Sequence, residues 1–307
     1  MSAGAVIWSL IIITIAATSV LYPTQGMSVA LDWSGTALYL LALYTLHKLT
    51  QRQYPVASRI AHTFMQIFVF NQAAAYLTYP AMAAAPFPLA DAALSRADAL
   101  LGFDWRAWFL WVQNHPIFHW ALSVAYASIP LQLLVLVVCL AASDPDRLDE
   151  LVLSAIIAIA LTVPGMVLLP AVGAWTEHGI GLIEPWKHDI LLLRVHELPV
   201  VTKTQGIISF PSFHTSSAVL LANMARNHKI FVPILLLNFV VVVSVMSEGA
   251  HYFVDMLSGL IVALVAIVIT RQVLNRCHAM PSRAPLGATE GVAGSIGKPF
   301  VELPARQ

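Results

Sequence analysis

Long apolar runs separated by polar segments dominate the pattern of this chain. A helix that crosses a membrane needs about 20 mostly apolar residues, and about eight segments satisfy that rule, the sixth being the shortest. The segments are Val6–Leu21, Trp33–Leu49, Ile60–Ala84, Phe118–Ala141, Leu151–Val172, Phe213–Asn227, Ile230–Met246 and Tyr252–Thr270. This pattern predicts an all-α fold, a polytopic integral membrane bundle of helices.

Composition agrees with a membrane protein. Soluble proteins carry roughly a quarter charged residues, whereas this chain has 10% charged and 59% hydrophobic residues and a mean hydropathy of +0.77. The formal net charge is zero, so no overall field would attract nucleic acid. A secretory signal has basic residues before its apolar run, and no Lys or Arg precedes the first apolar run of this chain. We therefore expect that run to be a retained span.

The apolar runs divide the chain into three parts. Residues 1–50 hold two spans, residues 51–272 hold a six-span core, and residues 273–307 form a tail that we expect to be disordered and cytoplasmic. Within the core, the tryptophan-rich segment 87–113 predicts an interfacial helix or re-entrant element, with an ordinary loop as the alternative. Residues 173–212 form a long outer loop rich in ionisable groups.

Basic residues fall in alternate loops, which predicts the orientation of the chain. Lys and Arg near span ends stay on the cytoplasmic side, so both termini are expected in the cytoplasm and the long polar loop on the periplasmic, lumenal or exterior side. The expected cytoplasmic set is Lys48, Arg52, Arg59, Arg147, Arg226, Lys229, Arg271, Arg276 and Arg283. The exceptions, which call for a functional explanation, are Arg96, Arg106, Lys187, Arg194 and Lys203.

The first candidate element for chemistry ends the long loop, where Phe210-Pro211-Ser212-Phe213-His214 runs into an apolar segment. Pro211 and Ser212 are typical of a helix start, since the Ser hydroxyl can cap free backbone N–H groups. A helix that begins there directs its positive end toward the outer interface, which favours a phosphate group.

The second candidate element lies between the last two apolar runs and contains His251 and Asp255. Residues four apart share a helix face, so the carboxylate can fix the tautomer of the imidazole and stabilise its cationic form. A nucleophilic histidine requires that arrangement. The alternative is a structural pair that braces two helices, and the presence of two such elements on one side favours the catalytic interpretation.

Together the two elements resemble a known family. Phe-Pro-Ser-Phe-His-Thr followed by Gly-Ala-His-Tyr-Phe-Val-Asp-x-x-x-Gly is similar to two signature motifs of the type-2 phosphatidic acid phosphatase superfamily, with wording closest to its inositol phosphorylceramide synthase-like (inositolphosphotransferase) branch. The resemblance implies a six-span core from Ile60 to Thr270 with both histidines at its outer mouth. It also implies that His251 attacks phosphorus to form a phosphohistidine while Asp255 orients it. His214 would then act as acid and base, and Ser212 would hold phosphoryl oxygens.

The remaining family motif matches in part. Lys187-x6-Arg194-Val195 has the spacing of Lys-x6-Arg-Pro but lacks the proline, and Ser244-Val245 stands where the common third motif has Ser-Arg. Because cations must neutralise charge on the phosphoryl oxygens, we expect Arg194 and Lys187 to bind phosphate. The alternative for each is a solvated or headgroup-binding loop residue.

The other histidines are scattered without the spacing of a zinc site, so the sequence predicts neither a metal nor another cofactor. A stripe of polar residues on the third apolar run could face a headgroup pocket, although hydrogen bonds between helices are the favoured role. The stripe consists of Asn71, Gln72, Tyr76 and Tyr79.

These patterns predict a lipid phosphatase or phosphotransferase embedded in the membrane. Its donor would be a lipid phosphate, a lipid diphosphate or a phospholipid headgroup, and its acceptor would be water or the hydroxyl of a second lipid, as in the synthase-like branch. No pattern specifies a protein partner. Two rivals are a proton-coupled transporter, for which we find no repeated halves, and a scaffold that binds lipid without turnover.

Overall fold

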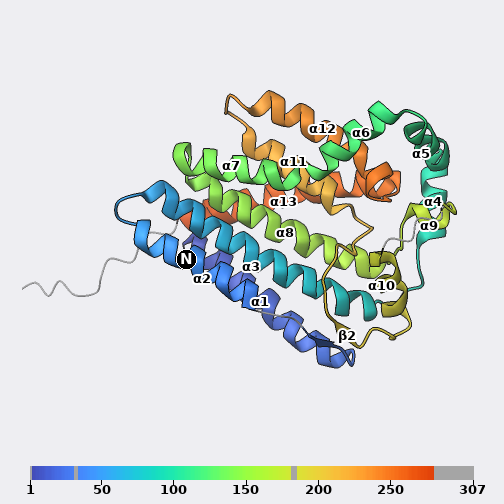
Figure 1. Cartoon of the computed structure of the whole chain (residues 1–307), viewed down its shortest axis with the longest axis horizontal. Helices are drawn as coiled ribbons and strands as arrows, with labels where there is room; N and C mark the ends of the chain where they lie inside the picture. Colours follow the sequence, from blue (N-terminus) through green and yellow to red (C-terminus); the bar gives the residue numbers. More distant parts are fainter. Residues whose placement is uncertain (1, 31–33, 181–184, 280–307) are drawn as a thin grey trace, which may run out of the picture.

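The computed structural model describes residues 2–30, 34–180 and 185–279, and this part of the chain is a bundle of helices (Figure 1). The prediction of an all-α polytopic membrane protein is confirmed. The helices are α1 Ala3–Thr24, α2 Ser34–Thr50, α3 Pro55–Ala83, α4 Asp91–Leu100, α5 Trp105–Gln113, α6 Pro116–Ala127, α7 Ile129–Ser143, α8 Asp146–Leu168, α9 Ala174–Glu177, α10 Pro185–Arg194, α11 Phe213–Ala225, α12 Phe231–Glu248 and α13 Phe253–Ala279.

Fewer helices have the length and apolarity of a membrane span than the sequence predicted. Among the described residues, α1, α8, α12 and α13 qualify, with mean hydropathies of 2.1 to 2.5, and the bent pair α6 and α7 gives a fifth. A helix forms at each of the eight expected places, but α2 has 17 residues and α11 has 13. The helix at the third expected place, α3, has 29 residues, but it is not among the helices that are apolar enough to span a membrane, because it carries several polar side chains. The expected count of eight full spans is therefore not confirmed.

The predicted span Phe118–Ala141 is broken, because the structure divides it into α6 and α7, which meet at an angle of 47°. Ser128 separates them and Pro130 lies in the first turn of α7. Proline has no N–H to donate, and its ring clashes with the preceding turn of a continuous helix. The chain therefore bends at this point.

Four short helices, α4, α5, α9 and α10, gather at one end of the long helices (Figure 1). The predicted interfacial segment 87–113 is helical, but it forms the two helices α4 and α5, and Trp105 is only 1% exposed. Trp105 and Phe109 of this segment therefore pack onto the protein, whereas Phe87 and Trp111 are exposed. The long loop 173–212 contains α9 and α10, and its strand β2, Val200–Val201, pairs in parallel with β1, Ser28–Val29.

The predicted tail begins later than expected. Helix α13 continues to Ala279, so residues 273–279 are helical, and the rest of the predicted tail lies outside the described residues.

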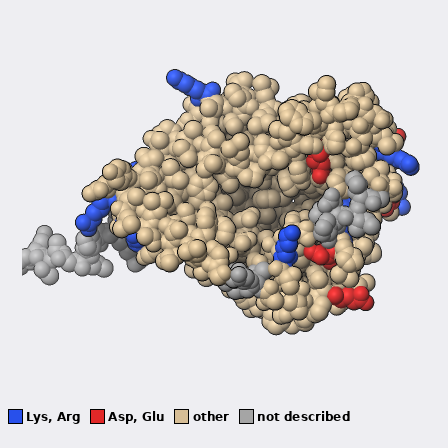
Figure 2. Space-filling view, in the orientation of Figure 1, with Lys and Arg blue, Asp and Glu red and all other residues tan. Residues whose placement is uncertain are grey.

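At the opposite end, three of the expected cytoplasmic basic residues surround Glu150 at the start of α8. The Arg226 guanidinium lies 2.7 Å from this carboxylate, Arg271 lies 3.6 Å away and Arg147 lies 3.7 Å away. Loops that the sequence predicted to share a side therefore do meet. In the view of Figure 2 the charged side chains lie mostly toward the two ends of the molecule, and the middle is almost uncharged.

Candidate functional site

The two motif histidines lie next to each other. His214 is in the first turn of α11 and His251 is just before α13, and their ring centroids are 6.2 Å apart. The expectation that the starts of these two helices meet is confirmed. Arg226 follows the last residue of α11, so the histidines lie at the end of the bundle away from Glu150.

A close contact between α11 and α13 brings the histidines together. The Ser212 N–H donates to the Asp255 carbonyl at 3.0 Å, and the Ser216 hydroxyl donates to the Gly259 carbonyl at 2.8 Å. A Cβ on Gly259 would collide with the carbonyl of Ser212. Glycine is therefore required at position 259, which explains why it belongs to the motif.

His251 and Asp255 form the expected pair. The His251 Nδ1 lies 3.4 Å from Asp255 Oδ2, and the side chains are 3% and 0% exposed. This contact is longer than a well-formed hydrogen bond, so it orients the ring loosely. The same carboxylate oxygen accepts the Tyr252 N–H at 2.8 Å and the Ser209 hydroxyl at 3.4 Å, which fix its position.

Burial keeps His251 uncharged. His251 lies in the loop before α13, and removal from water lowers the pKa of its ring to about 4, although a hydrogen bond to the Ser209 backbone acts in the opposite direction. A neutral imidazole has a free lone pair, which a nucleophile or base needs.

Ser212 caps α11 as the sequence predicted. Its side-chain oxygen accepts the Thr215 N–H at 3.3 Å, and the residue is fully buried. The hydroxyl is therefore occupied in holding the helix start in place, next to His214.

Both histidines line a cavity of about 750 Å³. Its walls come from α3, α6, α8, the loop before α11, and the ends of α11 and α12. In the space-filling view, this face of the molecule is hollowed near its middle (Figure 2). The lining residues are Asn71, Gln72, Ala74, Ala75, Thr78, Tyr126, Ile159, Trp175, Thr204, Gln205, Gly206, Ile207, Ile208, Phe213, His214, Glu248, Gly249 and His251.

The structure does not bring Arg194 to this cavity. Its guanidinium donates to the carbonyls of Met82, Ala85 and Phe87 at 3.1, 2.5 and 2.5 Å. It therefore satisfies backbone groups that the end of α3 leaves without helical partners. The geometry gives no support to the predicted phosphate contact of Arg194.

Lys187 lies closer to the cavity but not on its wall. The residue is 4% exposed, and its ammonium donates to the Thr176 hydroxyl at 3.2 Å and lies 4.8 Å from the ring centroid of Trp175. Trp175 does line the cavity, so this side chain lies between the Lys187 ammonium and the cavity.

Two aspartates of α4 support the site and were missed in the sequence. Asp98 accepts the N–H groups of Phe253 and Val254, both at 2.9 Å, and so satisfies free donors at the start of α13. Asp91 accepts the Gly173 N–H at 2.7 Å and the Tyr252 hydroxyl at 2.9 Å. Because the two aspartates are seven residues apart, they share a helix face, and this spacing is the signal that could have identified them.

A second missed group lies beside His214. The Tyr126 ring stacks on the His214 ring with centroids 4.4 Å apart, and its hydroxyl is 3.4 Å from Nδ1. Glu248 also lines the cavity, and its Oε2 accepts the Ser123 hydroxyl at 2.6 Å and lies 3.4 Å from His119 Nε2. Its position three residues before His251 was the only sequence signal for this carboxylate.

The polar stripe of α3 divides between two roles. Asn71 and Gln72 line the cavity, as a headgroup pocket would require. The Tyr79 hydroxyl is instead buried in a network in which it donates to Asp189 at 3.2 Å and accepts the Gln205 N–H at 3.0 Å. Tyr79 therefore joins α3 to the long outer loop.

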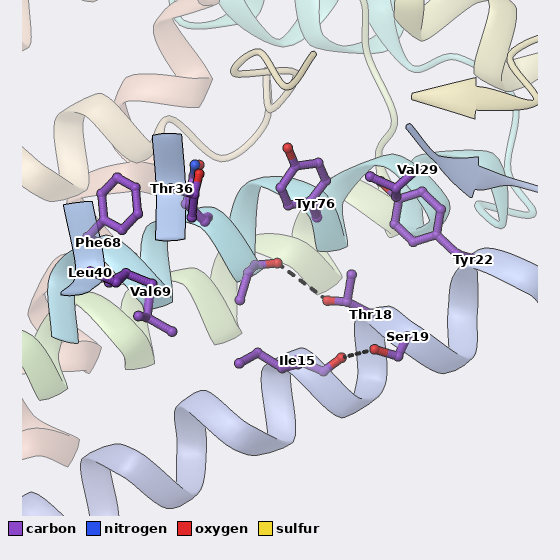
Figure 3. A pocket seen from close by; sticks show the side chains of 12 residues that line it. Ile15, Thr18, Ser19, Tyr22, Val29, Thr36, Leu40, Phe68, Val69 and Tyr76 are labelled. Atoms are coloured by element: carbon purple, nitrogen blue, oxygen red, sulfur yellow. Dashed lines mark hydrogen bonds between the residues drawn. The ribbon is translucent and has the colours of Figure 1, made fainter. Parts of the chain in front are cut away.

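Two apolar cavities adjoin the cavity of the histidines. One, of about 370 Å³, lies among α2, α3, α7, α8 and α11 and shares Asn71, Ala74, Ile159 and Phe213 with it. The other, of about 330 Å³, lies among α1, α2 and α3 and shares only Gln72 (Figure 3). Two of the hydroxyl groups in its lining donate to backbone carbonyls, Thr18 to Ala73 at 3.4 Å and Ser19 to Ile15 at 2.9 Å. This second apolar cavity therefore offers little polar chemistry.

Within the part of the chain that the structure describes, no three His, Cys, Asp or Glu side chains gather as metal ligands would. A family model described as the PAP2 superfamily matches residues 92–269, more than half of the 307 residues. The matched range contains His214, His251 and Asp255, and it excludes α1 to α3. No curated protein and no solved structure gave a match.

Proposed function

Because the chain belongs to the PAP2 superfamily, whose members are generally phosphatases, we propose that it cleaves a lipid phosphate, a lipid diphosphate or a phospholipid headgroup through a phosphohistidine. The observation that carries this proposal is the meeting of His214 and His251 in one cavity, with Asp255 behind His251. The acceptor is water or a lipid hydroxyl, as in the inositol phosphorylceramide synthase-like branch. The chemistry needs no metal ion.

In the first step, the free ring nitrogen Nε2 of His251 forms a bond to phosphorus while the bond from phosphorus to the leaving oxygen breaks. A proton on His214 passes to that oxygen. Asp255, next to Nδ1, stabilises the positive charge that develops on the His251 ring. Covalent catalysis of this kind divides one difficult displacement into two easier ones.

In the second step, the acceptor oxygen bonds to phosphorus as the bond to His251 breaks. His214 takes the proton of the acceptor, which regenerates both rings. The phosphoryl oxygens lie beside the first turn of α11, where the positive end of the helix favours an anion.

The neighbouring apolar cavity supports a lipid as substrate. Because it shares four residues with the histidine cavity, an alkyl chain can occupy it while the phosphate lies at the histidines. Burial of such a chain contributes about 0.8 kcal/mol for each methylene.

The transporter alternative fits the geometry less well. The ionisable groups His214, Glu248 and His251 lie at the start of α11, the end of α12 and just before α13, at one end of the bundle. Proton-coupled transporters instead place their sites near the middle of the membrane. We propose that this end faces the periplasm, lumen or exterior and that both termini are cytoplasmic, as the positions of the basic residues favour. Labelling of single cysteines with a membrane-impermeant reagent tests this orientation.

The enzymatic test uses purified protein with a panel of lipid phosphates, diphosphates and phospholipids, with and without a lipid hydroxyl acceptor, and mass spectrometry of the products. We expect turnover by the native chain, loss of turnover in His251→Ala and severe slowing in His214→Ala. His278→Ala is the matched control, since His278 is exposed near the far end of α13. Unchanged rates in His251→Ala with a correctly folded protein would overturn the proposal.

A further inference from the structure

The charge of the histidine cavity is unusual for a site that binds phosphate. Among its described lining residues, none is Lys or Arg, and the acidic one is Glu248. The two predicted phosphate-binding cations lie elsewhere, Arg194 at the end of α3 and Lys187 behind Trp175. A phosphate monoester, with up to two negative charges, would meet a carboxylate with no cation on the wall to balance it.

Glu248 is also incompletely satisfied. Its Oε2 has the Ser123 hydroxyl and the His119 ring as partners, whereas its Oε1 is buried and accepts no hydrogen bond from a described residue. A buried carboxylate oxygen without a partner is costly. A donor from a bound ligand would remove that cost.

The position of Glu248 suits a group attached to the reacting phosphate. Gly249 follows it, and a Cβ on Gly249 would lie 2.8 Å from the His251 ring and 3.0 Å from the Tyr126 hydroxyl. The carboxylate therefore belongs to the same small region as the two histidines. A ligand that spans this region needs a phosphate at the histidines and a hydrogen-bond donor a few atoms away.

We propose that the substrate is a zwitterionic phospholipid, whose headgroup ammonium binds Glu248 while its phosphate lies between His214 and His251. This proposal rests on the proposed phosphohistidine chemistry and specifies its substrate. A phosphodiester with an ammonium group carries one negative and one positive charge. Its phosphate lies at His214, which carries the proton for the leaving oxygen, and its ammonium lies at the Glu248 carboxylate. The ammonium supplies the donor that Glu248 Oε1 lacks, and a charged hydrogen bond of this type is among the stronger ones.

The reaction of such a lipid begins at its phosphate. His251 forms a bond to phosphorus, the bond from phosphorus to the diacylglycerol oxygen breaks, and His214 supplies a proton to that oxygen. The phosphorylated amino alcohol remains on His251 with its ammonium at Glu248. The oxygen of water or of a lipid hydroxyl then bonds to phosphorus as the bond from phosphorus to His251 breaks, and its proton passes to His214. The phosphorylated amino alcohol leaves free or as an ester of the acceptor lipid.

The test compares phosphatidylethanolamine, phosphatidylglycerol and phosphatidic acid of identical acyl composition in mixed micelles. Native protein is expected to release diacylglycerol from phosphatidylethanolamine at least about tenfold faster, in kcat/KM, than from the other two lipids. Glu248→Gln, which keeps the shape and the Ser123 contact, is expected to remove that preference by lowering kcat/KM for phosphatidylethanolamine at least about tenfold more than for phosphatidylglycerol. Glu197→Gln, at an exposed position, is the matched control and should behave as the native chain.

A binding measurement separates this inference from the proposed chemistry. Native mass spectrometry of His251→Ala is expected to show tighter binding of phosphatidylethanolamine than of phosphatidylglycerol, and the added Glu248→Gln substitution is expected to abolish the difference. The native chain could turn over every lipid no faster than His251→Ala does, while the binding preference for phosphatidylethanolamine is still observed. In that case the phosphohistidine proposal fails and the ammonium site stands. Equal binding and equal rates for the three lipids, or an equal effect of Glu248→Gln on all of them, would overturn the ammonium site.

Discussion

The indole N–H of Trp105 donates a hydrogen bond of 2.9 Å to the backbone carbonyl of His251. Trp105 begins α5, in the segment that the sequence analysis assigned to the membrane interface, and it is almost fully buried. The short helices at this end of the bundle therefore hold the loop that carries His251. Their role is to position the site as well as to cover it.

Replacement of Trp105 by Phe removes this hydrogen bond and leaves a buried carbonyl unsatisfied, at a cost of about 1–3 kcal/mol. We expect kcat to fall by about tenfold with a smaller change in KM, because the His251 loop loses its position but the substrate pocket remains. Steady-state kinetics on the purified variant measure this split. Trp120→Phe, at a position that is 68% exposed, is the control. A kcat equal to that of the native chain would show that Trp105 does not position His251.

Chelation tests the expectation that the chemistry needs no metal ion. Prolonged dialysis against EDTA is expected to leave kcat unchanged, since His251 supplies the nucleophile and α11 the electrostatic stabilisation. Loss of activity that returns on addition of Mg²⁺ or Zn²⁺ would contradict this expectation.

Stability should depend on pH through His251. Because burial lowers the pKa of its ring from 6.5 to about 4, only the unfolded chain binds a proton there between these values. Stability is therefore complete above pH 6.5 and falls as the pH decreases toward 4, by up to about 1.4 kcal/mol per pH unit. Thermal unfolding in detergent at pH 7 and pH 5 measures the effect. His251→Gln is expected to have a smaller drop in Tm, and an equal drop would show that His251 does not titrate in this way.

A narrower apolar cavity beside the histidines, the one of about 370 Å³, should raise the KM of long-chain lipids more than that of short-chain lipids. Ala155 lines that cavity and not the histidine cavity, so Ala155→Phe is expected to raise KM at least about tenfold for long-chain lipids through lost burial, with little change for short-chain analogues. Val268→Phe, on the exposed face of α13, is the control. An equal effect on short and long chains would mean that the alkyl chain lies elsewhere.

Some of this site follows directly from sequence. The spacing of His251 and Asp255 on one helix face, the cap at Ser212 and the pairing of two motifs at helix starts all depend on local geometry, which sequence encodes well. The structure places these residues together as predicted.

Other features depend on contacts between distant segments. Arg194 has the spacing of a phosphate ligand, but the free carbonyls at the end of α3, more than 100 positions away, occupy its guanidinium. The roles of Asp91 and Asp98 depend in the same way on how α4 packs against the start of α13. Hydropathy likewise predicted the places of the helices and the shortness of α11, but not the bend at Pro130.

In the proposed mechanism, His251 carries the phosphoryl group during turnover. The most direct measurement is a rapid alkaline quench of the native protein with labelled substrate, followed by peptide mass spectrometry under conditions that preserve phosphohistidine. We predict a phosphoryl or phosphodiester adduct on His251, formed as fast as product and absent from His251→Ala. An adduct on a different residue, or turnover by the native chain with His251 unmodified at every time point, would contradict the account.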